Sequence, residues 1–186
     1  MRRRHPLPKI WLMTDQRFGD RLFSSIRRLP IGSGVIFRHY ELGETQRFAL
    51  FQQVAHICRQ RGHILLLAGS ERSALHWRAD GFHRRVKRRS KILQSVSVHD
   101  RRELAEARRM KSAMMLVSPI FATNSHPGQS PLGLHGLNRM AAKVNGAKII
   151  ALGGVTRQKA KLLNQRLIYG WAAIDGLMGR KITTKT

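Results

Sequence analysis

Cysteine, acidic residues and long apolar runs are all scarce in this 186-residue sequence. The single cysteine, Cys58, cannot form an internal disulfide and fits a small core residue in a reducing cytoplasm. No apolar run approaches the roughly 18 residues that a membrane-spanning helix requires, and none of signal-peptide length follows the basic residues 2–4. With 42% apolar residues, the chain can build one domain with a substantial core. We therefore expect a soluble, cytoplasmic, globular protein with no membrane partner.

The shortage of acids makes the chain strongly basic. Ten Asp and Glu residues stand against 35 Lys and Arg, for a net charge of +25, a balance typical of proteins that bind nucleic acid. The cations are spread over almost every predicted helix and loop, and the densest block is Arg84–Lys91, with six basic residues in eight. Zinc-ligand spacing, a recognition helix and an aromatic RNA-binding motif are all missing from the sequence. The charge therefore predicts nonspecific association with phosphates rather than sequence-specific recognition.

Apolar and amphipathic segments alternate along the chain. The pattern predicts eight strands, at residues 9–14, 35–38, 64–68, 81–83, 93–98, 113–120, 148–152 and 171–174. Helices are predicted at residues 20–29, 44–61, 70–77, 101–110, 134–144 and 157–165. This alternation favours an α/β fold, a single small (β/α)8 TIM barrel, with a doubly wound open sheet as the alternative.

Four details complete the prediction. We assign the barrel to residues 9–178, between basic tails at 1–8 and 179–186. The segment after the fourth strand, between His83 and Leu93, is too short for a full barrel helix. Gly62 is expected to end the second helix in a left-handed conformation, and Asp100 to cap the fourth. The second helix should turn its apolar residues inward: Phe48, Phe51, Val54, Ala55 and Cys58.

Polar residues gather where the predicted strands end, which is the face of such a barrel that binds ligands. Hydroxyls, imidazoles, glycines and one arginine predominate there: Thr14, Asp15, Arg38, His39, Tyr40, Gly69, Ser70, His83, Ser97, His99, Ser118, Thr123, Ser125, His126, Gly153, Gly154, Asp175 and Gly176. Such a set suits an anionic, phosphorylated small molecule. Each residue taken singly could instead be a satisfied polar group at a strand end.

Six segments in order resemble the thiamine phosphate synthase and thiazole tautomerase family of (β/α)8 barrels. They are Leu12–Asp15, Val35–Arg38, Ala79–His83, Ser95–His99, Ser118–Thr123 with Pro127–Gly128, and Ile150–Val155. The resemblance covers residues 10–178. It implies a role in thiamine biosynthesis, where the family's synthase, a transferase, joins a pyrimidine diphosphate to a thiazole phosphate and uses Mg²⁺ to help diphosphate leave.

The resemblance also implies roles for particular residues. Arg38 corresponds to an arginine that contacts the pyrimidine diphosphate, and Ser97 to a serine near the pyrimidine ring. The hydroxyls of Thr123 and Ser125 match a pair that holds phosphate oxygens. Gly153 and Gly154 match glycines whose N–H groups receive the thiazole phosphate. Among residues able to transfer protons, we single out His126 and, less strongly, His99; Arg38 and His126 are the candidate catalytic residues.

The sequence departs from the family pattern at the metal site. The family's two acidic Mg²⁺ ligands align with Ala68-Gly69 and with Arg85–Arg88, so no metal ligand is predicted and the Mg²⁺ cofactor is doubtful. At the end of the last strand Asp175 stands where the family uses a serine on phosphate, and the tautomerase histidine aligns with Pro119.

Several interpretations stay open. The chain could be a relative whose metal-dependent synthesis is lost or weakened, including a catalytically silent or tautomerase-like protein that binds thiazole phosphate, pyrimidine diphosphate or thiamine phosphate. Alternatively, the basic block at Arg84–Lys91 could replace the metal, because arginine pairs with diphosphate oxygens. The third interpretation is a basic barrel recruited to nucleic acid. A homodimer through outer-helix Phe and Trp residues also stays open.

Overall fold

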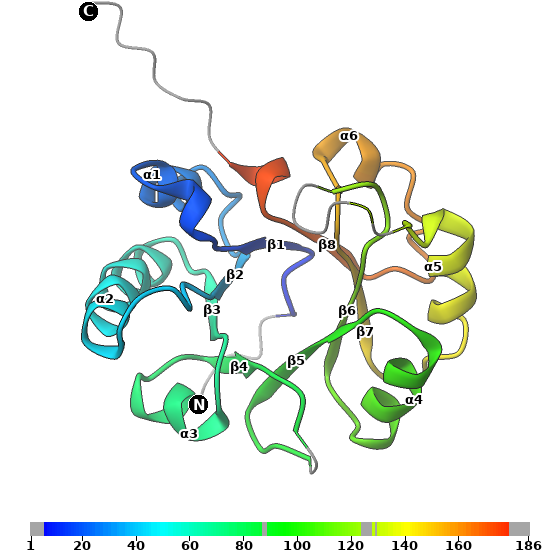
Figure 1. Ribbon diagram of the computed structural model, residues 1–186, viewed down its shortest axis with the longest axis horizontal. Coiled ribbons are helices and arrows are strands. Elements are labelled where there is room, and N and C mark those ends of the chain that lie inside the picture. Colours follow the sequence, from blue (N-terminus) through cyan, green and yellow to red (C-terminus); the bar gives the residue numbers. More distant parts are fainter. Residues whose placement is uncertain (1–5, 87–88, 124–127, 129, 179–186) are drawn as a thin grey trace, which may run out of the picture.

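The computed structural model describes residues 6–86, 89–123, 128 and 130–178. Eight parallel strands close into a barrel in sequence order, and β1 pairs with β8 through Ile10 opposite Trp171 (Figure 1). The strands are β1 (Ile10–Met13), β2 (Gly34–Phe37), β3 (Ile64–Leu67), β4 (Gly81–His83), β5 (Leu93–Val98), β6 (Met114–Val117), β7 (Lys148–Ala151) and β8 (Gly170–Ala173). The predicted (β/α)8 barrel is confirmed, and the open-sheet alternative is wrong.

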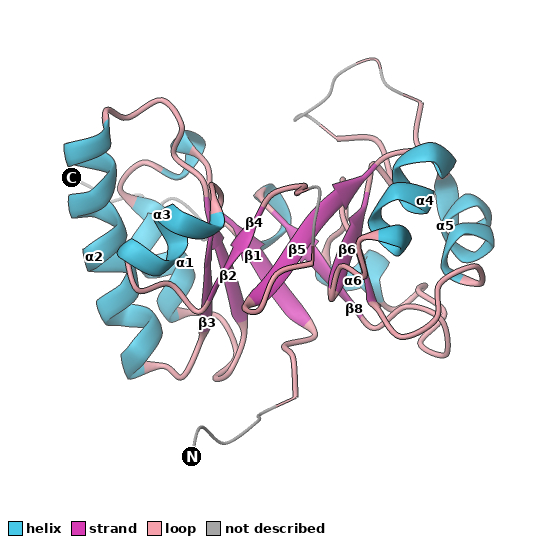
Figure 2. Ribbon diagram, turned by 90° about the horizontal axis from the view of Figure 1, so that it is seen from below, coloured by secondary structure: helices cyan, strands magenta, loops and turns pink. Residues whose placement is uncertain are grey.

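Helices surround this barrel, with α1 to α3 on one side and α4 to α6 on the other (Figures 1 and 2). They are α1 (Arg21–Arg27), α2 (Glu44–Gln60), α3 (Glu71–His76), α4 (Arg101–Arg109), α5 (Gly133–Ala141) and α6 (Arg157–Ala160), with 3₁₀ turns at Gln16–Phe18 and Asp175–Leu177. Between β4 and β5 the described residues, 84–86 and 89–92, form no helix, as the sequence predicted. No helix in the described part of the chain is both long and apolar enough to span a membrane.

Close packing of a tryptophan on a glycine shapes the start of the barrel. Trp11 in β1 is fully buried, and its indole N–H donates to the carbonyl of Pro8 at 2.7 Å. Gly34 lies opposite Trp11 in β2, and a Cβ there would approach the Trp11 ring to 2.1 Å. Only glycine therefore leaves room for the indole at this crossing, and any larger side chain would displace it.

Two predicted elements are only about half as long as expected. The apolar run at 113–120 forms a strand only over Met114–Val117. Pro119 has no N–H to donate to a neighbouring strand, so the regular ladder does not continue past this point. It nevertheless stays beside the segment after β7, since the amides of Ile120 and Phe121 donate to the carbonyls of Leu152 and Gly153. The helix predicted at 157–165 is the single turn Arg157–Ala160, and i→i−3 turns follow it.

The helix α2 is largely as predicted. Phe51, Val54, Ala55 and Cys58 are buried, and burial raises the pKa of the Cys58 thiol to about 12, so it is an inert core residue. The prediction that Phe48 points inward is wrong, because 38% of this residue is exposed. Its ring packs edge-on against the Trp77 ring, with 5.2 Å between the centroids.

Both predicted helix ends are confirmed. Gly62 follows α2 with φ of 62°, the left-handed conformation expected of a glycine that ends a helix. The side chain of Asp100 caps α4 by accepting from the amide of Glu103 at 2.8 Å.

Candidate ligand-binding site

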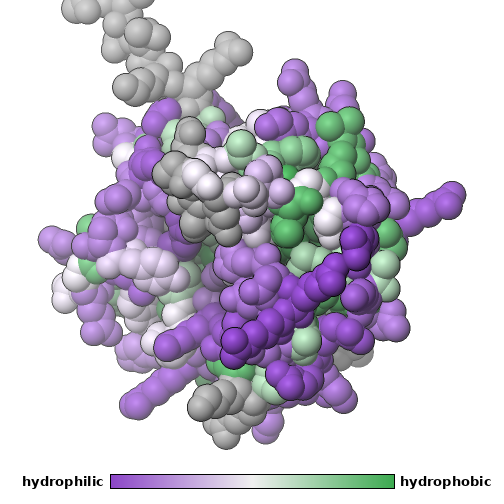
Figure 3. All heavy atoms as spheres, turned by 45° about the vertical axis from the view of Figure 1, so that its right-hand side comes forward, coloured by the Kyte–Doolittle hydropathy of each residue, from purple (hydrophilic) through white to green (hydrophobic). Residues whose placement is uncertain are grey.

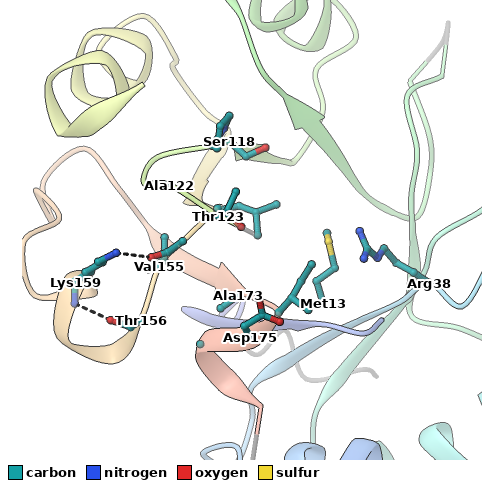
Figure 4. A pocket seen from close by; sticks show the side chains of 16 residues that line it. Met13, Arg38, Ser118, Ala122, Thr123, Val155, Thr156, Lys159, Ala173 and Asp175 are labelled. Atoms are coloured by element: carbon teal, nitrogen blue, oxygen red, sulfur yellow. Dashed lines mark hydrogen bonds between the residues drawn. The ribbon is translucent and has the colours of Figure 1, made fainter. Parts of the chain in front are cut away.

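A cavity of about 260 Å³ opens where β1, β6, β7 and β8 end (Figure 4). The ends of five strands supply its walls: Met13 at the end of β1; Arg38 after β2; Ser118, Pro119, Ala122 and Thr123 after β6; Leu152, Gly153, Gly154, Val155, Thr156 and Lys159 after β7; and Ala173, Ile174, Asp175 and Gly176 at and after the end of β8. Parallel strands bring their carboxyl ends to one face of a barrel, which is why residues more than 100 positions apart meet here.

The structure brings together four of the predicted site residues and leaves two apart. Arg38, Thr123, Gly153 and Gly154 all line the cavity. Ser97 and His99 are not among its walls. Ser125 and His126 lie outside the described residues.

The paired glycines after β7 allow two loops to touch. Gly153 and Gly154 have φ of 90° and 63°, a region that side chains rarely adopt. A Cβ on Gly154 would lie 2.3 Å from the carbonyl oxygen of Ala122, and one on Gly153 would lie 2.7 Å from the Cα of Pro119. Glycine is therefore required at both positions for the β6 and β7 loops to form this wall.

Arg38 lies at the end of β2 and lines the cavity. Thr14 and Asp15, the two residues that follow β1, hold its side chain in place. Its Nε donates to the carbonyl of Thr14 at 3.0 Å, and its Nη2 pairs with Asp15. Its backbone amide also donates to the Thr14 hydroxyl. The side chain is thus fixed on one side by β1 and turned toward the cavity on the other (Figure 4).

A chain of ion pairs runs from Arg38 through Asp15 and Arg17 to Asp175 at the rim of the cavity. Arg17 bridges the two acids, at 2.8 Å from Asp15 and 3.1 Å from Asp175. Burial alone would raise the pKa of Asp15, but hydrogen bonds from Arg17 and the charge of Arg38 outweigh it and hold that pKa below its usual value. Asp175, the acid at an expected phosphate position, therefore has its charge partly offset by Arg17.

Lys159 is a cationic wall residue that the sequence reasoning missed. Its Nζ donates to the carbonyl of Gly154 at 3.3 Å and lies 4.8 Å from the Phe121 ring centroid. Thr156 caps α6 by accepting from the Lys159 amide, which fixes the lysine beside the glycine pair (Figure 4). The signal that could have revealed it is its place in the first helical turn after the Gly-Gly pair. Lys159 and Arg38 lie on opposite sides of the cavity (Figure 4).

His83 lies at the end of β4 with both ring nitrogens occupied. Nδ1 lies 2.8 Å from the Ser95 hydroxyl and Nε2 lies 3.1 Å from that of Ser97. Burial, with a smaller effect from the charge of Arg38, lowers the pKa of His83 to about 4, so the ring is neutral near pH 7. Ser97 is thus engaged by an imidazole.

His99 turns toward α4. Its Nδ1 lies 2.9 Å from Glu103, which also accepts from the His99 amide at 2.7 Å. The ring borders a separate hollow between α4 and α5.

The basic block at Arg84–Lys91 is only partly described. Arg85 pairs with Glu103 at 3.0 Å and Glu106 at 3.1 Å, and it also donates to the Ser97 carbonyl. Its guanidinium is thereby committed to α4. Residues 87 and 88 lie outside the described part of the chain.

The described residues at this face do not fit a Mg²⁺ ion. In the described residues no group of three His, Cys, Asp or Glu side chains is placed to hold a metal. In the Ala68-Gly69 pair, where the resemblance implies an acidic ligand, the carbonyl of Ala68 accepts a hydrogen bond from Arg47 at 2.7 Å. Asp15 and Asp175 both pair with arginine. A cation would have to displace guanidinium groups here.

Fold and cavity together place the chain in the class of (β/α)8 barrel proteins. The chain belongs to the thiamine monophosphate synthase family, whose model matches residues 12–177. The resemblance seen in the sequence is therefore confirmed, and with it the link to thiamine biosynthesis.

Individual relatives agree with this family. A candidate thiamine-phosphate synthase of Aquifex aeolicus is 28% identical over 182 residues, covering 91% of this chain and 97% of the relative. The thiamine-phosphate synthase of Syntrophomonas wolfei is 27% identical, covering 91% and 88%. The thiamine phosphate pyrophosphorylase of Pyrococcus furiosus shares the fold with a TM-score of 0.77 at 19% identity, covering 93% of this chain and 88% of that one.

Proposed function

We propose that this protein binds a phosphorylated thiazole or pyrimidine of thiamine biosynthesis in the cavity at the carboxyl ends of its strands. One observation carries the proposal: the cavity has a wall of two left-handed glycines flanked by Lys159 and faced by Arg38. A glycine pair that lines the cavity and two cations suit a phosphate ester, because backbone amides bind phosphate and charge-assisted hydrogen bonds to phosphate are among the strongest that proteins make.

In this proposal the two ends of the cavity hold different groups. The phosphate of the thiazole lies at Gly153, Gly154 and Thr123, with Lys159 supplying the positive charge. Arg38 contacts the diphosphate of a pyrimidine ligand, and its pairing with Asp15 fixes its direction. His126, three positions after Thr123 in the sequence and outside the described residues, is the proposed proton carrier.

We further propose that Mg²⁺-dependent synthesis is lost or much weakened. The acids that would hold the metal are replaced, and the two acids of the rim already pair with arginines. The protein would then bind family ligands with little or no transfer. Replacement of the metal by the basic block is the less favoured alternative, because Arg85 is committed to Glu103 and Glu106.

A pair of measurements tests both parts. Thiazole phosphate, thiamine phosphate and inorganic pyrophosphate are each titrated while the melting temperature is followed, because a ligand that prefers the folded state raises it in a concentration-dependent way. Synthesis from the two phosphorylated precursors is then assayed with Mg²⁺ and with a chelator. We expect a shift with thiazole phosphate and no Mg²⁺-dependent product. A normal Mg²⁺-dependent rate refutes the loss of synthesis, and the lack of any shift refutes binding.

A further inference from the structure

Acidic residues are distributed unevenly along the chain. Nine of the ten lie at or before Glu106, and the next is Asp175, so residues 107–174 contain no acid but ten Lys and Arg. These residues build α5, α6 and the end of α4, which lie on one side of the barrel (Figures 1 and 2). The positive charge is therefore uncompensated on a particular side of the molecule.

Two hollows mark this side, one at each end of α4. The first, of about 370 Å³, lies between the start of α4 and α5, with a rim of Arg101, His135, Arg139 and Lys143. The last three recur every four residues along α5 and the turn that follows it, where Lys143 lies. The second, of about 810 Å³, lies between the end of α4 and the connection after α5, and includes Arg108, Arg109 and Lys111. We call these seven residues the α4–α5 surface.

The acids near this surface are already engaged. Glu103 and Glu106 pair with Arg85, His99 and Arg102, and Asp100 caps α4. Within the described part of the chain no acid pairs with a member of the α4–α5 surface, and all seven are exposed. Figure 3 looks toward this side and shows hydrophilic side chains across much of it.

The length, charge and residue types of the α4–α5 surface indicate which kind of anionic partner it fits. The nine residues of α4 span about 13 Å, roughly the axial rise of four nucleotides, and carry Arg101 at one end and Arg108 and Arg109 at the other. Among the described residues, neither hollow is lined by Phe, Trp or Tyr, which excludes stacking on bases. None of the exposed large apolar residues of the described chain belongs to the α4–α5 surface, although Leu162 and Leu167 follow α6 on the same side. The surface itself therefore presents cations rather than an apolar face to a lipid bilayer.

We infer that the α4–α5 surface binds the phosphate backbone of double-helical nucleic acid without regard to sequence. The surface lies on the outside of the barrel, apart from the cavity that would hold a phosphorylated ligand. Binding of a duplex and binding of thiazole phosphate are therefore separable properties of one protein.

The opposite side of the molecule supplies a matched control. Arg27, Arg28 and Arg59 are equally exposed, on and after α1 and on α2, and those two elements also carry or adjoin Asp20 and Glu44. The test variant is Arg101→Gln, Arg139→Gln, Lys143→Gln. The control is Arg27→Gln, Arg28→Gln, Arg59→Gln, which removes the same charge from the full chain.

Binding of short fluorescein-labelled RNA and DNA duplexes of unrelated sequence is measured by anisotropy over a salt series. We expect the test variant to lose about tenfold or more in affinity at low salt, and its slope of log K against log salt to fall by about one for each cation removed. The control should change little. Unaltered melting curves, and unaltered shifts with pyrophosphate, show that fold and cavity are intact.

Three outcomes would overturn the inference. Equal losses in both triple variants would mean that net charge alone drives binding. A strong dependence on duplex sequence would contradict a phosphate-only contact. Binding to phosphatidylserine vesicles with none to either duplex would assign the surface to a membrane.

Discussion

Arg47 donates from Nε to the backbone carbonyl of Arg38 at 2.7 Å, and from Nη2 to that of Ala68 at 2.7 Å. One side chain of α2 thus ties the ends of β2 and β3 together beside the cavity. Its guanidinium lies 5.8, 5.2 and 5.4 Å from the ring centroids of Phe37, Tyr40 and Trp77. Burial lowers the pKa of Arg47, although arginine stays charged at any ordinary pH.

This tie predicts that Arg47→Met destabilises the protein and misplaces Arg38. Two half-buried carbonyls would lose a charged donor, at a cost of roughly 2 to 4 kcal/mol. We expect denaturant unfolding to show this loss, and calorimetry to show weaker pyrophosphate binding. Arg47→Lys should restore only part of the lost stability and binding, since one ammonium group cannot donate to both carbonyls in the way that the planar guanidinium does. Arg59→Met, on the exposed side of the same helix, is the control, and an equal loss there would refute the assignment.

The glycine wall predicts a strong effect of one methyl group. In Gly154→Ala the new Cβ would meet the Ala122 carbonyl at 2.3 Å, in a left-handed backbone at φ 63°. Gly62 has φ of 62° and no heavy atom within 4 Å, so Gly62→Ala introduces the strain without the clash. We expect Gly154→Ala to melt lower than Gly62→Ala and to lose thiazole phosphate binding by tenfold or more. Identical behaviour of the two variants would show that the close approach does not matter.

His83 predicts a pH dependence of stability. Its pKa is about 4 in the folded chain, against 6.5 for an ordinary histidine, so between these values the unfolded state binds more protons. Stability from this residue is present above about pH 6.5 and is lost as pH falls toward 4, by on the order of 2 to 3 kcal/mol. Unfolding of wild type and His83→Gln at pH 7, 5.5 and 4.5 isolates it from His63, whose pKa burial also lowers. If the unfolding free energies of wild type and His83→Gln change in parallel with pH, His83 does not contribute to the pH dependence.

Replacement of Asp175 by asparagine is expected to raise the affinity of the cavity for a phosphorylated ligand. Its carboxylate lies at the cavity and pairs with Arg17 at 3.1 Å. In Asp175→Asn the repulsion is removed and Arg17 is left with a single acid, so phosphate binding should tighten, by about threefold to tenfold at low salt. Isothermal titration with thiazole phosphate measures this, with the exposed Asp20→Asn as control for net charge. Weaker binding in Asp175→Asn would mean that the acid itself contacts the ligand.

Local signals were enough to predict most of the barrel. Alternating apolar segments located all eight strands, and the turn glycine at Gly62 and the cap at Asp100 were read directly from residue type. Element ends were less predictable. The apolar run at 113–120 gave no sign that Pro119 would stop the strand at Val117, because a proline ends hydrogen bonding without altering apolarity.

The site was predictable as a set of strand ends but not as a set of side-chain directions. Arg38, Thr123 and the glycine pair meet because the register of β2, β6 and β7 requires it. His99 turns to Glu103, a choice made by a hydrogen bond that no periodicity encodes. Lys159 was missed because its role depends on a helix of one turn, Arg157–Ala160, and on the cap at Thr156.

The described residues of the connection between β4 and β5 form no helix, so they give this stretch of the barrel no outer layer like the α-helices that follow β1 to β3 and β5 to β7. Among its described residues, the partly buried Val86 and Ile92 pack against the core, and the side chain of Gln94 donates to the Arg84 carbonyl at 3.0 Å. Fewer buried apolar groups must separate for these strands to part. Amide deuteration should therefore reach β4 and β5 before any other pair of strands, which makes this seam the weakest in the wall.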